Sequence, residues 1–137
     1  MTIDEARDFI RTHHRAVLAT RRRDGGFQQS PIAVVTDDDG TLMISSRETA
    51  MKTHNLRRDP LGAVCVFTDS FWGQSWASAE GRFTVESLPQ AMEALVRYYR
   101  LVSGEHPDWE DYRDAMVREK RVILRMTIDR AGPTRQG

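Results

Sequence analysis

The sequence predicts an α+β fold in which an antiparallel six-stranded β-barrel carries flanking helices. Short strand-like runs are joined by tight-turn signals at Asp24-Gly25 and Asp39-Gly40, which is typical of antiparallel hairpins. Helical segments occur at the start, in the middle and late in the chain, whereas a Rossmann fold would alternate helices with strands throughout. A closed barrel also removes exposed sheet edges. A length of 137 residues indicates a single domain over residues 1–137.

The first half of the chain predicts one helix and a three-stranded meander. Thr2 and Glu5 have the spacing of a capping box, so we expect a short helix over residues 4–13. The predicted strands of the meander cover residues 16–20, 27–36 and 41–46, and the two tight turns lie between them.

The second half predicts three helices and three strands. Asp59-Pro60 ends a helix over residues 47–58, and the continuous apolar run 63–67 indicates a strand buried on both faces, with Cys65 as a small core residue. Gly81 predicts a bulge or bend in a long strand over 75–86. Helices over 89–102 and 108–119, a last strand over 121–128 and a mobile tail from residue 131 complete the prediction.

Composition narrows the functional classes. The formal net charge of +0 argues against nucleic-acid binding, and no apolar run reaches the roughly 18 residues of a membrane span. The polar, acidic N-terminus and the single cysteine favour the cytoplasm. The four histidines lack metal-ligand spacing, so we expect no metal site.

Residues 45–60 are the most informative segment. Ser45 and Ser46 end a predicted strand just before a helix, whose free N–H groups and positive end favour a phosphate. Lys52 is placed to fold back onto that anion, and Arg47 and the Ser46 hydroxyl add further donors. The alternative reading is a capped, solvated helix with ordinary surface cations.

The same segment resembles the phosphate segment of the pyridoxamine-phosphate-oxidase-like split β-barrel superfamily. The pattern is hydroxyl-Arg-x(4)-Lys-x-x-Asn-Leu-x-x-Asp-Pro, and it follows a hairpin with an Asp-Gly turn. Residues 75–82 resemble the cofactor-edge strand of that superfamily, and residues 99–113 resemble a late helical segment of its actinobacterial branch, the B group of deazaflavin-dependent oxidoreductases. The resemblance covers nearly the whole chain in order.

The resemblance implies a homodimer with a cofactor pocket between two subunits. Met51, Lys52, Arg47 and the Ser45–Ser46 backbone would hold the phosphate, and Pro31, Ile32 and Ala33 would line the ring system. Gln74 and Trp76 would come from the partner subunit. Asn55 is a further candidate, although hydrogen bonding within the helix–strand corner explains it equally well.

The resemblance also bears on the cofactor. Pyridoxamine-phosphate oxidases carry extra basic residues that bind the phosphate of FMN. At the matching positions this chain has only uncharged residues, namely those of the run 33–36 and Met51. This difference favours coenzyme F420, whose anionic oligoglutamate tail the arginines at 21–23 and 57–58 are placed to receive, although solvated loop arginines are the simpler explanation.

The function that follows is hydride transfer between the deazaflavin and a flat, conjugated small-molecule acceptor such as an enone, a quinone or a tetrapyrrole. No residue stands out as a catalytic acid. Two alternatives keep the same fold: an FMN-dependent enzyme of the pyridoxamine-phosphate-oxidase type, and a carrier that binds F420 or a flavin without turnover.

Overall fold

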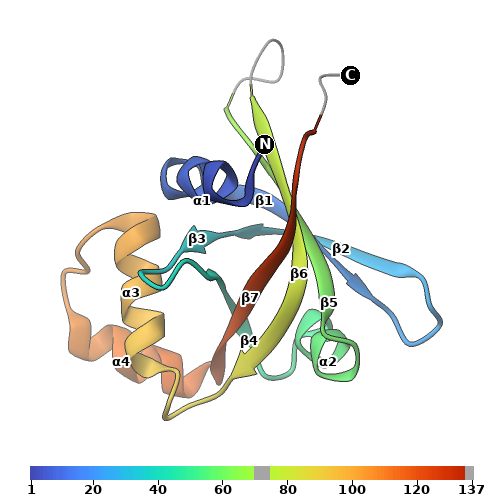
Figure 1. Cartoon of the computed structure of the whole chain (residues 1–137). Coiled ribbons are helices and arrows are strands. Elements are labelled where there is room, and N and C mark those ends of the chain that lie inside the picture. The colour runs from blue at the N-terminus through green and yellow to red at the C-terminus, as the bar shows by residue number, and fades with distance from the viewer. Residues whose placement is uncertain (70–74, 135–137) are drawn as a thin grey trace.

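The computed structural model describes residues 1–69 and 75–134, which form four helices and seven strands in one antiparallel sheet (Figure 1). The strand order is β2-β1-β5-β6-β7-β4-β3, so β7, the last strand in the chain, lies between β6 and β4. In chain order the elements are α1 (Ile3–Thr12), β1 (Arg15–Arg21), β2 (Phe27–Ala33), β3 (Val35–Thr36), β4 (Leu42–Arg47), α2 (Met51–Arg58), β5 (Leu61–Phe67), β6 (Trp76–Glu86), α3 (Met92–Ser103), α4 (Trp109–Arg118) and β7 (Arg121–Gly132).

The described strands number seven, and not the expected six, because the segment predicted as one strand over 27–36 is divided at Val34. The Val34 N–H donates to the His14 carbonyl at 2.9 Å, and His14 Nδ1 lies 2.9 Å from the Val34 carbonyl. Before this point β2 pairs with β1, and after it β3 pairs with β4. The two edge strands are therefore joined by a single residue, and the sheet curls into a half-barrel.

The inner face of the curled sheet holds the main core. Alternate residues of the strands point inward, among them Leu18, Ile44, Val64 and Leu124, and each is at most 2% exposed. At one end α1 buries Ala6 and Ile10 against this core. The predicted capping box is confirmed, since the Thr2 side chain accepts from Glu5 N–H and the Glu5 side chain accepts from Thr2 N–H.

The helices α3 and α4 form a second core with the opposite face of β3, β4 and β7. Leu95 and Tyr112 pack there with Val35, Met43 and Ile123, all of them buried. Figure 1 shows the two helices together on one side of the curled sheet. The first of them begins at Met92, three residues after the predicted start at Pro89.

The outer face of β1, β5 and β6 remains open to solvent in the described chain. Along β5 the side chains of Val64 and Val66 are buried, whereas Leu61, Cys65 and Phe67 are exposed. The prediction that residues 63–67 are buried on both faces, with Cys65 in the core, is therefore wrong for the single chain. Helices α1 and α2 contact the sheet from its inner side, and α3 and α4 cover β3, β4 and β7, so no helix within the described residues covers the outer face of β1, β5 and β6.

The bend predicted at Gly81 is confirmed as a register shift between Glu80 and Gly81 in the β6–β7 pair. Gly62 lies directly opposite Gly81 in the β5–β6 pair, so two residues without side chains face each other at the bend. The pairing of β7 with β6 continues to Ser78 and Gly132. Residues 131 and 132 therefore belong to the last strand and not to a tail.

Candidate functional site

The corner between β4 and α2 holds most of the residues predicted to bind a phosphate. The helix α2 begins at Met51, not at the predicted Arg47, because residues 48–50 form a turn. Ala50 is the N-cap residue, and no side chain caps the helix. The N–H groups of Met51 and Lys52 consequently have no carbonyl acceptor within the helix.

Lys52 is half-buried at this helix start, and among the described residues its ammonium has no carboxylate partner. Burial lowers the pKa of Lys52, and the positive charge of Arg121 lowers it further. Lys52 therefore lies near a second cation, Arg121, which is paired with Glu119 at 2.7 Å, whereas Lys52 itself has no carboxylate partner among the described residues. An anion bound here would relieve this repulsion.

The two serines of β4 point to opposite faces of the sheet, as successive strand residues must. Ser46 is 2% exposed, and its hydroxyl lies 2.9 Å from that of Thr53, which itself donates to the Arg47 carbonyl at 2.7 Å. The Ser46 hydroxyl thus ties β4 to α2, while its role as a donor to a phosphate stays a prediction. Ser45 points toward α3 and α4, where it lines a cavity.

The other polar candidates have partners of their own. Arg47 is exposed and pairs with Glu119 at 3.2 Å. Asn55 is 1% exposed, donates at 3.1 Å to both Thr20 Oγ1 and Gln28 Oε1, and accepts from Arg58 at 3.2 Å. Asn55 therefore fastens α2 to the first hairpin, while its role toward a cofactor stays a prediction.

Strand β2 carries Pro31, Ile32 and Ala33, the residues predicted to line a ring system. Pro31 is exposed, and the other two are partly exposed. The Ala33 carbonyl accepts a hydrogen bond from the Tyr98 hydroxyl at 2.8 Å. The neighbouring Ser30 has a buried hydroxyl that lacks a hydrogen-bond partner among the described residues, so a polar group of this strand is left for a ligand.

The two residues predicted to come from a partner subunit are not near the α2 corner. Trp76 begins β6 opposite Phe67, at the end of β5 that lies about 20 Å from the end of α2. Its side chain is 43% exposed. Gln74 lies outside the described residues. A single chain therefore does not bring Trp76 and Lys52 together.

A cavity of about 770 Å³ lies between α2 and the turn that joins β1 to β2. Its lining carries four arginines against one aspartate: Arg22, Arg23, Asp24, Met51, His54, Asn55, Arg57 and Arg58. Arg58 donates only to neutral groups, the Arg21 carbonyl and the Asn55 side chain, and Arg23 has no partner in residues 1–69 and 75–134. We call this the arginine cavity. Arg22 pairs with Asp24 and Arg57 with Glu48, so the charges of Arg23 and Arg58 are the ones left without a carboxylate among the described residues.

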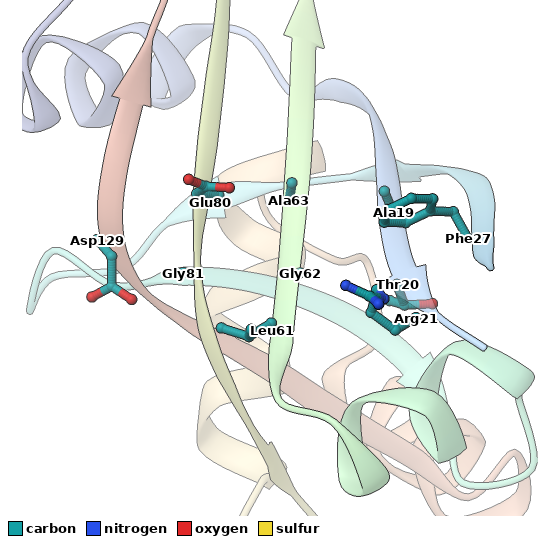
Figure 2. Close-up of a pocket in the computed structure, with 10 residues that line it drawn as sticks. All are labelled: Ala19, Thr20, Arg21, Phe27, Leu61, Gly62, Ala63, Glu80, Gly81 and Asp129. Carbon is teal, nitrogen blue, oxygen red and sulfur yellow. The ribbon is translucent and has the colours of Figure 1, made fainter. Parts of the chain in front are cut away.

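A separate hollow of about 380 Å³ lies on the open outer face of the sheet. Figure 2 shows Arg21 and Phe27 on one side of it and Glu80 and Asp129 on the other, with Leu61 between them. Its floor includes the facing glycines Gly62 and Gly81. Of its ten lining residues only Arg21 was predicted to approach a cofactor, through the F420 tail, so this hollow belongs to the open face and not to the α2 corner.

Sequence reasoning missed Arg121 and Tyr98, which complete the surroundings of the α2 corner. Arg121 begins β7, 69 positions after Lys52, and pairs across the sheet with Arg47. Tyr98 lies on α3, and burial raises the pKa of its hydroxyl. Neither residue carries a local signal, because only the pairing of β7 with β4 and the packing of α3 bring them here.

The part of the chain that the structure describes contains neither a metal-ion cluster nor a membrane-spanning helix. Its histidine, cysteine, aspartate and glutamate side chains form no group of three or more that would hold a metal ion. None of its helices has the length and apolar character needed to cross a membrane.

Comparison with known proteins identifies the family. The model of the pyridoxamine 5'-phosphate oxidase family matches residues 2–134. The conserved hypothetical protein Rv2991 from Mycobacterium tuberculosis has a similar structure, with a TM-score of 0.80 and 25% identity over 96% of this chain and 82% of that one.

Two more distant structures share the fold. An F420 reductase has a TM-score of 0.71 and 16% identity over 91% of this chain and 94% of its own. General Stress Protein 26 from Bacillus anthracis has a TM-score of 0.66 and 12% identity over 94% of this chain and 90% of its own. The family model covers the α2 corner, the curled sheet and both late helices, and the chain belongs to the pyridoxamine 5'-phosphate oxidase family.

Proposed function

We propose that this protein is a coenzyme F420-dependent oxidoreductase that works as a homodimer and reduces a conjugated small molecule. The observation that carries the proposal is the half-buried Lys52, which faces Arg121 with no acidic partner among the described residues. A half-buried lysine without a carboxylate partner, beside the free N–H groups of a helix start, is suited to hold a phosphate. Phosphate groups are common to FMN and F420.

The residues present fit such a cofactor. Lys52 and the N–H groups of Met51 and Lys52 would hold the phosphate, with Arg121 adding positive charge. Pro31, Ile32 and Ala33 would lie along the ring, and the unpartnered Ser30 hydroxyl offers it a hydrogen bond. When bound, the reduced deazaflavin supplies a hydride, and the chain supplies orientation and shelter from water.

The choice of F420 over FMN rests on charge. The side chain next to Lys52 is Met51, which is 58% exposed and adds no positive charge for the FMN phosphate. The arginine cavity adjoins Met51 and carries four guanidinium groups, which suits an anionic tail that FMN lacks. An FMN-dependent enzyme and a non-catalytic carrier of F420 or a flavin are the alternatives.

Parallel titrations of the cofactor-free protein with F420 and FMN, followed by cofactor fluorescence, test the proposal. We expect F420 to bind in the low micromolar range and FMN to bind more weakly. Tighter binding of FMN would show that FMN, and not F420, is the cofactor, without changing the assignment of the fold. Binding of neither would refute a flavin-type site. Tight binding without reduction of any acceptor would favour the carrier.

Replacing Lys52 by alanine is expected to weaken F420 binding by about 1.5–3 kcal/mol, because a hydrogen bond to a charged group is lost. This corresponds to a dissociation constant raised by about 10- to 150-fold. Lys120, the only other lysine, is exposed and serves as the matched control. Unchanged affinity in Lys52→Ala, or an equal loss in Lys120→Ala, would place the phosphate elsewhere.

The homodimer is proposed on the open outer face of β1, β5 and β6. Leu61, Phe67 and Trp76 are 51%, 42% and 43% exposed there, and Cys65 lies between them on β5. An apolar strand exposed on one face is suited to pack against a second copy. A two-subunit pocket would also explain how Trp76, which does not reach the α2 corner of its own chain, could contact a cofactor bound at the α2 corner of the partner subunit.

Replacing Leu61 by aspartate is expected to convert the dimer to a monomer, because each interface would then bury a carboxylate without a partner. Size-exclusion chromatography with light scattering gives the mass directly. Leu101→Asp is the control, since Leu101 is 42% exposed and lies on α3, away from the open face. A wild-type monomer, or a Leu61→Asp variant that stays dimeric, would contradict this interface.

A further inference from the structure

A second cavity of about 380 Å³ lies between α3, α4 and the outer face of β4 and β7. We call it the α3–α4 cavity. Its lining is rich in aromatic side chains and consists of Ser45, Tyr98, Tyr99, His106, Asp111, Tyr112, Ala115, Met116, Glu119 and Arg121. The volume lies near the lower end of the roughly 300–1,000 Å³ of small-molecule sites, so it suits a ligand of two or three fused rings.

The aromatic walls form one continuous cluster. The Tyr99 ring centroid lies 4.9 Å from that of His106 and 5.1 Å from that of Tyr112, and the His106 and Tyr112 centroids are 5.5 Å apart. Trp109 stands behind them, 5.7 Å from Tyr99 and 5.5 Å from Tyr112. Such a surface favours a flat, conjugated ligand, because rings stack on rings.

Hydrogen bonds fix these walls in place. The Tyr112 hydroxyl donates to the Leu95 carbonyl at 2.6 Å, and the Trp109 indole N–H donates to Glu105 at 3.0 Å. Arg100 pairs with the same Glu105 at 2.8 Å and lies over the Trp109 ring at 4.8 Å. A ligand therefore meets a site that is already formed, which lowers the entropic cost of binding.

The charges in the cavity favour an uncharged ligand. Arg121 donates to Glu119 through Nε at 3.1 Å and Nη2 at 2.7 Å, so its positive charge is already paired with a carboxylate. Asp111 adds a second carboxylate to the lining. An acidic ligand in the cavity would be repelled by the two carboxylates, and the one cation there is already paired.

The His106 ring offers a polar group that can orient such a ligand. The Asp108 N–H donates to His106 Nδ1 at 2.9 Å, so a neutral His106 carries its proton on Nε2. Nε2 has no hydrogen-bond partner within the described ranges. It is therefore a donor suited to a carbonyl oxygen.

We propose that the α3–α4 cavity binds uncharged, flat, conjugated carbonyl compounds of the quinone type. The cavity adjoins the predicted cofactor strand, because Tyr98 lines it and donates to the Ala33 carbonyl at 2.8 Å. The role of the ligand as electron acceptor rests on the proposed function, whereas its binding does not. The site thus selects quinones and related enones from the conjugated molecules, and disfavours acidic ones.

The test measures quenching of tryptophan fluorescence by menadione in protein without cofactor. We expect saturable quenching that is lost in Trp109→Phe, because Trp109 belongs to the cluster. Tyr99→Leu is expected to raise the dissociation constant of menadione at least tenfold. A naphthoquinone that carries a sulfonate is expected to bind the wild-type protein at least tenfold more weakly than menadione does. Phe27→Leu, an exposed aromatic outside the cavity, is the control and should bind as the wild type does.

Quenching that persists in Trp109→Phe, equal affinity in Tyr99→Leu, or equal affinity for the sulfonate would each overturn the proposal. His106→Gln provides a second variant with a smaller change in packing, and its expected effect is weaker binding of menadione. Circular-dichroism melting identifies variants that fail to fold. F420 titration of the same variants is a separate measurement, so failure of the quinone site and failure of the cofactor site are distinguishable.

Discussion

Replacing Asp37 by asparagine is expected to lower the free energy of unfolding by about 3 kcal/mol. Asp37 is 3% exposed, and its carboxylate accepts from Arg97 Nε and Nη2, both at 3.0 Å, and from Arg125 Nη1 at 2.8 Å. The asparagine keeps the shape but removes the negative charge that both cations share, and only Arg125 retains another close carboxylate, Glu86 at 2.9 Å. The expected loss is at the lower end of the range for buried pairs, because the Arg97 side chain is 39% exposed and water screens it.

Urea unfolding at neutral pH and at acid pH measures this loss. Burial opposes ionisation of Asp37, but hydrogen bonds from Arg97 and Arg125 outweigh it and hold the pKa of Asp37 well below its ordinary 3.8. The stabilisation is therefore complete above the ordinary pKa and is lost as pH falls below it. The difference between wild type and Asp37→Asn should shrink below about pH 4.

Asp38→Asn is the control, since Asp38 is the exposed neighbour and should change stability by less than about 0.5 kcal/mol. Equal stability of wild type and Asp37→Asn at neutral pH would show that the two arginines do not need this carboxylate. A difference that stays constant through the acid range would show that Asp37 does not titrate with a lowered pKa.

Replacing Gly81 by alanine is expected to cost at least about 3 kcal/mol, beyond the usual range for overpacking. A Cβ at this position would lie 1.9 Å from the Thr127 carbonyl oxygen and 2.9 Å from its carbon. These are backbone atoms of the paired strand β7, so relief requires separating two strands at the bulge. Either the bend is lost or the β6–β7 ladder opens.

Thermal melting of Gly81→Ala beside Gly26→Ala checks this expectation. A Cβ at Gly26 meets the end of the flexible Arg22 side chain at 2.5 Å, which moves away at little cost. Melting temperatures that fall equally in both variants would mean that loss of glycine, and not the backbone clash, is responsible. Native stability in Gly81→Ala would mean that the bulge has room for a side chain.

The parts of the fold that local chemistry determines could be predicted from the sequence. Thr2 and Glu5 form their capping box, and Asp108 caps α4 by accepting from Asp111 N–H, because each motif needs only neighbouring residues. The bulge at Gly81 follows in the same way from a glycine inside a strand. The break at Val34 could not be predicted, since it depends on hydrogen bonds to His14, 20 positions away.

The ion pairs of Asp37 show the same limit. The sequence indicates a turn after a strand at this position, and the turn forms, but Arg97 and Arg125 lie 60 and 88 positions further along the chain. For the candidate site, the motif around Lys52 is local and was found. Arg121 and the contact of Ser46 with Thr53 depend on how β7 and α2 pack against β4, which spacing alone does not reveal.

The position of β7 between β6 and β4 has a consequence for how the chain folds. Without β7 the strands make two unconnected groups, β2-β1-β5-β6 and β4-β3. During synthesis β7 emerges after the other six described strands, so both groups must wait for it before any ladder joins them. A sheet completed by its last strand has contacts distant in sequence, so slow folding with a late cooperative step is expected. Of the seven described strands, the one that is synthesised last is therefore the one that makes the two groups a single sheet.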